Sequence, residues 1–394
     1  MQRGASPTAS GATPARHDKR AGKRIALVLQ GGGALGAYQA GVFQGLQEHG
    51  LTPDWVVGTS IGAVTAALIA GNPPTACLDR IRDFWDLVKH QDLFDMRRLP
   101  DAARRFNTWL STLHAVVEGV PGFFTPRPFN PFANGLQVDS ELASFYDTGG
   151  LAETLSRLVD FEYLQSSSAI RLTVNAMCVT TGELASFDSA TQRIGVEHVM
   201  ASSALPPGFP PVRIDGLLYW DGGLYSNTPI DIVLDDEPRV DTLCFMVDLW
   251  RAEGPEPRTF DEVQTRQKDV MFASRSRRHI EEYRRLHDLR NALHAMHLSL
   301  PQELRQVPKL QELAEAACDT TMHIVHLPYA GQDWHMAGKD INFSSGSLEW
   351  RWEQGYRDAG QAAEQAAWLA PQPPEIGVVV HELAPGRGSK HEQT

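Results

Sequence analysis

One stretch near the N-terminus constrains the fold most, because it twice repeats the order strand, tight turn, helix. The apolar run Ile25–Leu29 has the length of a strand buried on both faces of a parallel sheet. Gly31-Gly-Gly33 ends this run, and the spacing of the apolar residues that follow predicts a helix over 34–49. A second strand over 54–57 and a second helix over 60–70 come next. This order predicts a βαβ unit with a parallel sheet.

The rest of the chain extends this pattern less regularly. We predict further strands over 172–178, 183–188, 242–247 and 323–327, and long helical regions over 259–297 and 347–369. The fold class is therefore α/β: a three-layer domain around a central, mostly parallel sheet, with an α-rich C-terminal region.

Composition excludes several classes of protein. The net charge of −12 and the pI near 5.6 argue against a dedicated nucleic-acid binder, which would carry a basic domain. We find no apolar run long enough to cross a membrane. The four cysteines are far apart and form no CxxC or Cys/His cluster, so we expect no metal site and a reducing, cytoplasmic location.

The N-terminal residues 1–24 contain six Lys or Arg residues and a single acid, Asp18, but no apolar core of a secretory signal. We expect a disordered tail here. An organellar transit peptide has a similar composition and remains the alternative.

The first chemical motif is the glycine loop Gly31-Gly32-Gly33-Ala-Leu-Gly36, between a strand and a helix. A dinucleotide site has the same context, but it needs an acid at the end of the second strand, and Asp54 lies at the start of that strand. What remains is a cluster of uncrowded backbone N–H groups at a helix N-terminus, which is suited to an anion or an oxyanion.

The second motif is Gly58-Thr-Ser60-Ile-Gly62, also between a strand and a helix. A tight turn at this point would expose the Ser60 hydroxyl at the sheet edge, and the flanking glycines would relieve the crowding of that turn. The alternative is that Ser60 only caps the helix. The nearby glycine loop favours a nucleophile, with the N–H groups of Gly32 and Gly33 facing Ser60 as an oxyanion hole.

The third motif is Trp220-Asp221-Gly222-Gly223. Two glycines leave the Asp221 carboxylate free to approach another side chain closely. Taken alone, Asp-Gly is more often a simple turn.

Together, in this order and with Ser60 placed 29 residues after Gly31, the motifs resemble the patatin-like phospholipase family. Further matches are Gln39–Val42 and Ala201–Pro210, and the resemblance covers residues 24–233. It implies that Ser60 is the nucleophile, that Asp221 is the base, that the glycine loop forms the oxyanion hole and that no cofactor is needed. Where family members often carry Arg or Lys this chain has Leu35, which puts in doubt a cationic contribution to binding a phosphate head group.

The resemblance implies a Ser-Asp dyad, but an ordinary carboxylate is a weak base for an alcohol. A dyad would therefore depend on desolvation of the pair and on the oxyanion hole. The alternative is a triad in which Asp221 orients a later histidine such as His326 or His335. The early position of Ser60 in the strand order favours the dyad.

We divide the chain into a disordered tail (1–23), a patatin-like catalytic domain (24–233), a C-terminal extension (234–369) and a flexible tail (370–394). The extension contains Asp340–Phe343 and Arg351–Asp358, which resemble an uncharacterised extension of some bacterial patatin-like proteins. The expected function is acyl-ester hydrolysis of a phospholipid or lysophospholipid through an acyl-enzyme. An acyltransferase and a low-turnover, lipid-binding regulatory protein are the alternatives, and the oligomeric state is left open.

Two segments are candidates for a peripheral membrane contact. Phe123, Phe124, Phe129 and Phe132 lie in a proline-rich loop that would either meet a bilayer or fill the junction between domains. Arg275–Arg290 carries a net charge of +3, which would give either a weak anionic-membrane contact or a solvated face with internal ion pairs.

Overall fold

The structure is a computed structural model, and it describes residues 22–91, 101–128, 137–166, 169–273, 276–331, 337–373 and 375–383. No helix among these residues is both long enough and apolar enough to span a bilayer.

The main sheet contains the strands β1 (Arg24–Leu29), β2 (Trp55–Gly58), β5 (Arg171–Cys178), β6 (Leu184–Asp188), β7 (Val212–Ile214), β8 (Leu217–Asp221), β9 (Thr242–Asp248), β10 (Met322–Pro328) and β11 (Val378–Glu382). Their order is β11-β10-β9-β1-β2-β5-β8-β7, and β6 also pairs with β5. The strands from β11 to β5 are parallel, whereas β6 and β8 run antiparallel to β5. The short strands β3 (Thr125–Pro126) and β4 (Tyr146–Asp147) form a separate antiparallel pair.

The helices are α1 (Ala37–Glu48), α2 (Ile61–Ala70), α3 (Cys77–Val88), α4 (Asp101–Glu118), α5 (Gly149–Leu158), α6 (Val196–Ser202), α7 (Ile230–Leu234), α8 (Phe260–Phe272), α9 (Ser276–Ser299), α10 (Gln302–Arg305), α11 (Pro308–Glu315) and α12 (Ser345–Gln365). The single helical region expected over 259–297 is two helices, α8 and α9, because Ala273 leaves the helical conformation after α8.

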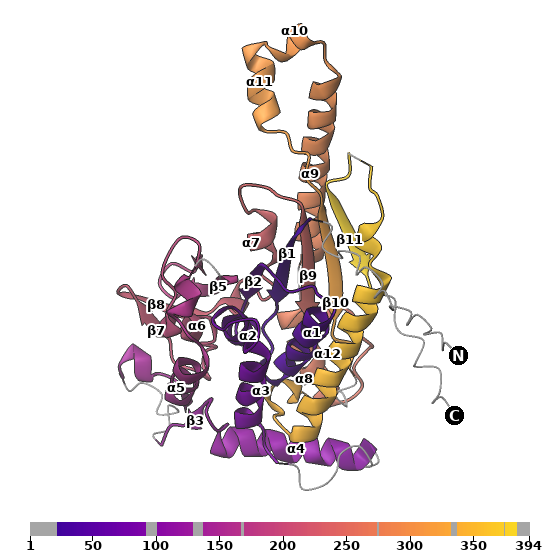
Figure 1. Ribbon diagram of the computed structural model, residues 1–394. Coiled ribbons are helices and arrows are strands. Elements are labelled where there is room, and N and C mark those ends of the chain that lie inside the picture. Colours follow the sequence, from indigo (N-terminus) through magenta and orange to yellow (C-terminus); the bar gives the residue numbers. More distant parts are fainter. Residues whose placement is uncertain are drawn as a thin grey trace, which may run out of the picture.

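Alternate side chains of β1 enter two separate cores. Ile25, Leu27 and Leu29 pack with α1, α2, α3 and α12 on one face of the sheet, while Ala26 and Val28 pack with α7 and α9 on the other. Helices therefore cover both faces of the sheet (Figure 1), and the predicted three-layer α/β class is confirmed. Full burial on both sides also explains why β1 is apolar without alternation.

The C-terminal region does more than pack on the catalytic domain. Strand β9 pairs directly with β1, and β10 and β11 continue the same sheet outward. The predicted boundary between residues 233 and 234 falls within α7. The flexible tail expected from residue 370 is corrected for Val378–Glu382, because the parallel pairing with β10 orders these residues as β11.

Helix α12 crosses α1 at very close range. A Cβ atom added to Gly41 of α1 would lie 1.9 Å from the carbonyl oxygen of Trp352, so only glycine allows this approach. Trp352 also donates a hydrogen bond from Nε1 to Gln44 at 2.7 Å. The extension is thus joined to the first helix of the catalytic domain by intimate packing.

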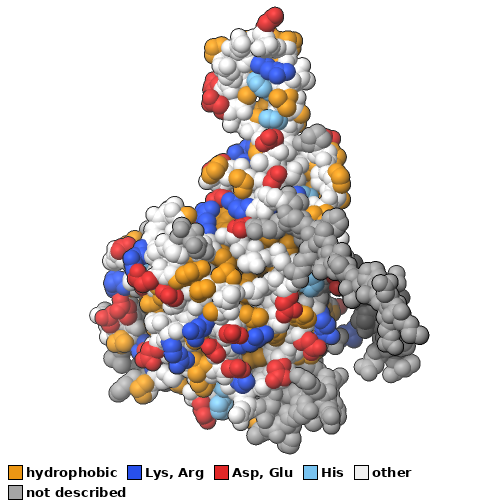
Figure 2. Space-filling view, in the orientation of Figure 1, with side chains coloured by type: hydrophobic (Ala, Val, Ile, Leu, Met, Phe, Trp, Pro, Cys, Tyr) orange, Lys and Arg blue, Asp and Glu red, His pale blue; other side chains and the backbone are white. Residues whose placement is uncertain are grey.

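The second half of α9 forms, with α10 and α11, an arm that stands away from the body (Figures 1 and 2). The arm leads through α11 into the start of β10, so it lies at the amino end of the parallel strands. On α9, Arg278 pairs with Glu282, Arg284 with Asp288 and Arg285 with Glu281. These ion pairs agree with the solvated-face interpretation of the basic segment.

Candidate active site

The predicted motifs meet around one cavity of about 300 Å³ at the carboxyl ends of the parallel strands. Gly31, Gly32 and Gly33 follow β1, Ser60 follows β2 and Asp221 ends β8, and all of them line this cavity. Most of the remaining wall is apolar and includes Ala115, Val116, Phe123, Phe124, Tyr146, Leu205, Phe209, Ile341 and Phe343. The cavity therefore combines a small polar end with a long hydrophobic lining, as a site for a lipid ester requires.

Ser60 lies on a sharp turn between β2 and α2. Its φ of 58° and ψ of −126° are rare for a residue with a side chain, and such strain is concentrated at functional sites. The turn is tight, since a Cβ added to Gly62 would lie 2.2 Å from the carbonyl oxygen of Leu29. Ser60 occupies the N-cap position, but its side chain makes no capping hydrogen bond. The capping interpretation is therefore wrong, and the hydroxyl group is left available at the cavity.

The backbone of Ser60 is held from α6. Ser202 Oγ accepts a hydrogen bond from the Ser60 N–H at 3.1 Å, and Ser203 Oγ donates one to the Ser60 carbonyl at 3.2 Å. Both serines lie in the Ala201–Pro210 segment that matched the family, but sequence reasoning assigned them no role. The sequence signal that could have found them is the Ser-Ser pair within this matching segment.

Asp221 ends β8 and is only 1% exposed. Its Oδ1 accepts a hydrogen bond from the N–H of Gly223 at 2.7 Å. This oxygen therefore stabilises the Asp-Gly turn. Oδ2 is buried with no hydrogen-bond partner among the described residues. Burial raises the pKa of Asp221 to about 7, although the neighbouring Ser60 hydroxyl and the Gly223 N–H both act to lower it. A carboxylate with this pKa is a far stronger base than an ordinary aspartate.

The glycine loop is held by two hydrogen bonds to the carbonyl oxygen of Gly31. Gly31 O accepts hydrogen bonds from Asn227 Nδ2 at 3.2 Å and from Trp250 Nε1 at 2.8 Å. In a trans peptide the C=O and N–H groups point in opposite directions, so these donors set the direction of the Gly32 N–H. Among the described residues, nothing accepts a hydrogen bond from the N–H of Gly32 or Gly33.

Residues of the C-terminal extension press against the same loop. Gly33 has a φ of +57°, and a Cβ at this position would lie 2.2 Å from the carbonyl oxygen of Asp340. The fully buried Arg351 donates from Nη1 to the carbonyl oxygen of Ala34 at 3.0 Å, and from Nη2 to that of Lys339 at 2.9 Å. Sequence reasoning missed Asn227, Trp250 and these contacts, because the residues involved lie more than 190 positions from the loop.

The other motif glycines lie where neighbouring atoms leave no room for a side chain. Gly36 ends the short 3₁₀ turn after the loop and packs on Ile61, Gly58 is the last residue of β2, and Gly222 packs against Asn175.

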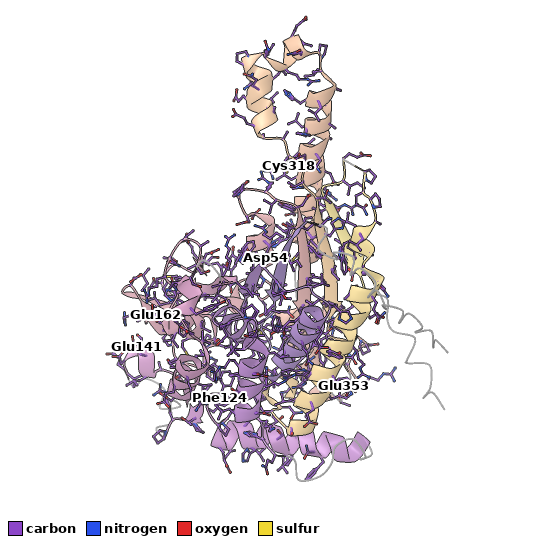
Figure 3. The ribbon with its side chains drawn as sticks, viewed as in Figure 1. Asp54, Phe124, Glu141, Glu162, Cys318 and Glu353 are labelled. Carbon is purple, nitrogen blue, oxygen red and sulfur yellow. The ribbon has the colours of Figure 1, made fainter. Side chains whose placement is uncertain are left out.

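The geometry supports neither a dinucleotide site at the glycine loop nor a triad through His326. Asp54, labelled in Figure 3, accepts from the N–H of Ile25 at the start of β1, at the sheet edge opposite the glycine loop. His326 lies between Asp248 and Glu382, at 3.0 and 2.8 Å, and not at the cavity. Among the described residues, no histidine lines the cavity; His335 lies outside them. No group of three or more His, Cys, Asp or Glu residues in the described chain could hold a metal ion.

The phenylalanine segment belongs to the core of the site. Phe123 and Phe124 are buried and pack with Phe209, and Phe123 also packs edge-on against Phe84 and Phe343. Figure 3 labels Phe124 inside the body, above α4. The expectation that these two rings meet a bilayer is wrong, because they form the cavity wall. Phe129 and Phe132 lie outside the described residues.

Comparisons with known proteins agree with the arrangement of motifs. The profile of a family described as Patatin-like phospholipase matches residues 27–234, and a second, described as Patatin phospholipase, matches residues 270–375. Lysophospholipase NTE1 of Candida glabrata is 29% identical over 238 residues, which cover 60% of this chain and 11% of that protein. Patatin-like phospholipase domain-containing protein 6 of Homo sapiens is 28% identical over 218 residues, covering 54% and 12%. The matched region is thus about a tenth of each of these relatives.

Among solved structures, VipD from Legionella pneumophila aligns over 87% of this chain and 67% of its own. The TM-score is 0.39 and the sequence identity 15%, values too low to add to the fold assignment.

Proposed function

The chain belongs to the patatin-like phospholipase family, and on that premise we propose that it hydrolyses acyl esters of phospholipids or lysophospholipids through Ser60 and Asp221. One observation carries this proposal. The Ser60 hydroxyl, on a strained turn, and the unpartnered Oδ2 of the buried Asp221 share the polar end of an apolar cavity.

In the first half of the reaction, Ser60 Oγ attacks the carbonyl carbon of the ester while Asp221 Oδ2 accepts the hydroxyl proton. The C=O bond becomes a single bond to an oxyanion, and the N–H groups of Gly32 and Gly33 are the donors that face it. Expulsion of the alcohol, which takes the proton from Asp221, leaves the acyl group on Ser60. The oxyanion donors act only on charge that develops in the transition state, so they lower the barrier without tightening the ground state.

In the second half, a water molecule attacks the acyl-enzyme and Asp221 accepts its proton. Collapse of the second oxyanion releases the fatty acid and returns the proton to Ser60. A raised pKa suits Asp221 for both halves, because the same carboxylate must accept a proton and then give it up.

The lining of the cavity supports a lipid substrate. Phe123, Phe124, Phe209 and Phe343 surround the space beyond Ser60 with aromatic carbon, which stabilises an acyl chain by removing it from water. Leu35 is fully buried and leaves the loop without a cation, so we do not assign a head group.

The test is a Ser60→Ala variant, compared with wild type in hydrolysis of a short acyl ester and in labelling by a fluorophosphonate. We expect ester hydrolysis to fall to background and labelling of the intact protein to disappear in mass spectra. A folded variant that keeps full activity would contradict the proposal.

The same assay distinguishes the transferase alternative. In a transferase, wild type would release a burst of alcohol without steady turnover, and an added alcohol or thiol acceptor would restore turnover. This result would indicate that the acyl group is passed to that acceptor rather than to water.

A further inference from the structure

Helix α4 has its polar side turned inward. Asn107, Thr108 and Ser111 are each between 1% and 9% exposed. Thr108 Oγ1 accepts a hydrogen bond from Asn342 Nδ2 at 3.4 Å, and Thr112 Oγ1 donates to Gly338 O at 3.4 Å. The helix is therefore docked on the body by polar contacts, the reverse of the usual arrangement for a helix on the surface of a protein in water.

The opposite side of α4 is apolar and faces outward. Its large side chains are 42% to 62% exposed and recur at helical spacing: Phe106, Trp109, Leu113, Val116 and Val117. The rings of Phe106 and Trp109 are stacked with centroids 6.0 Å apart. We call these five residues the α4 apolar face. A continuous exposed surface of this kind marks an interaction site.

Charge on this stretch is nearly absent. Between Phe106 and Glu118 the titratable side chains are His114 and Glu118, which pair at 3.0 Å. The α4 apolar face itself therefore offers no charged group to a partner, whereas it matches the hydrocarbon of a lipid layer.

The α4 apolar face is continuous with the catalytic cavity. Val116 is 44% exposed, yet it also lines the cavity that contains Ser60, together with its neighbour Ala115. Tyr146, another wall residue, donates from Oη to the Val116 carbonyl at 3.0 Å and so holds the end of α4 at the cavity mouth. Val116 therefore belongs both to the cavity wall and to the apolar face.

We propose that the α4 apolar face rests on a phospholipid layer and delivers the acyl chain past Val116 into the cavity. This inference rests on the proposed hydrolysis at Ser60. The contact is hydrophobic rather than electrostatic, so binding extends to neutral phosphatidylcholine vesicles and depends only weakly on salt.

The test variant carries Trp109→Gln, Leu113→Gln and Val117→Gln, which change the face but leave the residues of the cavity wall intact. In sedimentation with phosphatidylcholine vesicles we expect its binding to fall at least about tenfold, and its vesicle hydrolysis to fall in parallel. Hydrolysis of a short-chain ester in solution should stay within about twofold of wild type, because the catalytic pair is untouched.

The matched control carries Leu289→Gln, Met296→Gln and Leu298→Gln on α9. These residues are 54% to 66% exposed and lie at the amino end of the strands, away from the cavity. This variant should bind vesicles like wild type. Loss of binding in this control, or full binding by the α4 variant, would overturn the proposal.

Further variants separate a failure of the surface proposal from a failure of the catalytic proposal. The conservative variant Trp109→Phe should retain binding, and a Trp109→Gln single variant provides a second test if the triple variant melts at a lower temperature. Ser60→Ala should bind vesicles normally. If wild type hydrolyses nothing but binds through α4, the catalytic proposal fails and the surface proposal stands. A wild-type dimer that the α4 variant dissociates would instead show that a second copy covers this face.

Discussion

The two halves of the candidate active site, the turn at Ser60 and the glycine loop, are held in different ways. Among the described residues, the turn at Ser60 is supported from within the range 24–233, by Ser202, Ser203 and the close packing of Gly62 on Leu29. The glycine loop depends on residues more than 190 positions away in the sequence.

Three features of the C-terminal extension contact the loop directly. Trp250 donates to Gly31 O, the Asp340 carbonyl packs on Gly33, and Arg351 donates to Ala34 O. The extension therefore contributes contacts to the candidate active site. The extension also supplies β9, the direct sheet neighbour of β1, so it supports both the sheet and the loop.

The largest effect is expected at the nucleophile-base pair. Asp221→Asn keeps the size of the side chain and its acceptor for the Gly223 N–H but removes the base, so kcat should fall by about 10³. Steady-state kinetics on a short acyl ester measure this change. His326→Gln and His335→Gln should stay within a few-fold of wild type. A histidine variant as inactive as Ser60→Ala would replace the dyad with a triad.

The pH dependence of the hydrolysis rate tests the Asp221 carboxylate of the same pair. Asp221 must be ionised to accept a proton, and its pKa in the free protein is raised to about 7, so kcat/KM should rise with pH and reach half its maximum near that value. Between about pH 5 and about pH 8 the rate should increase roughly 100-fold for a single titrating base. A profile already flat from about pH 5 upward would show that Asp221 is an ordinary, low-pKa carboxylate.

The smallest effect is expected at the extension. Trp250→Phe keeps a ring against Phe272, 5.2 Å from the Trp250 ring, but removes the donor to Gly31 O. Loss of an oxyanion donor itself typically costs 10²–10³ in rate, and Trp250 acts one peptide group away, so we expect kcat to fall about tenfold with KM little changed.

The pH midpoint of Trp250→Phe should match that of wild type, since the base is not altered. An unchanged kcat would show that Asn227 alone orients the loop, and a shifted midpoint would mean that the two halves of the machinery are not independent.

Local patterns were enough to predict much of this molecule. The run Ile25–Leu29, the glycines around Ser60 and the apolar strand before Asp221 each define their own element, because backbone sterics and burial act over a few residues. The fold class followed from the order of these elements. The catalytic roles of Ser60 and Asp221 remain predictions that the variants above will test.

Other features could not be predicted from short segments. Phe123 and Phe124 are as apolar as the exposed residues of α4, and the sequence pattern does not indicate which group faces water. The last strand, β11, lies in a stretch rich in proline and glycine, and it is ordered by its pairing with β10 and by the packing of Val378 in the core on the α9 face of the sheet.

The sequence by itself determined the strand-turn-helix order, the strained position of Ser60 and the family, because these depend on neighbouring residues. Only the tertiary structure decided the raised pKa of Asp221, the orientation of the glycine loop by Trp250 and Arg351, and the outward apolar face of α4. Each of these depends on burial or on hydrogen bonds between distant segments, and such contacts exist only once the sheet has brought those segments together.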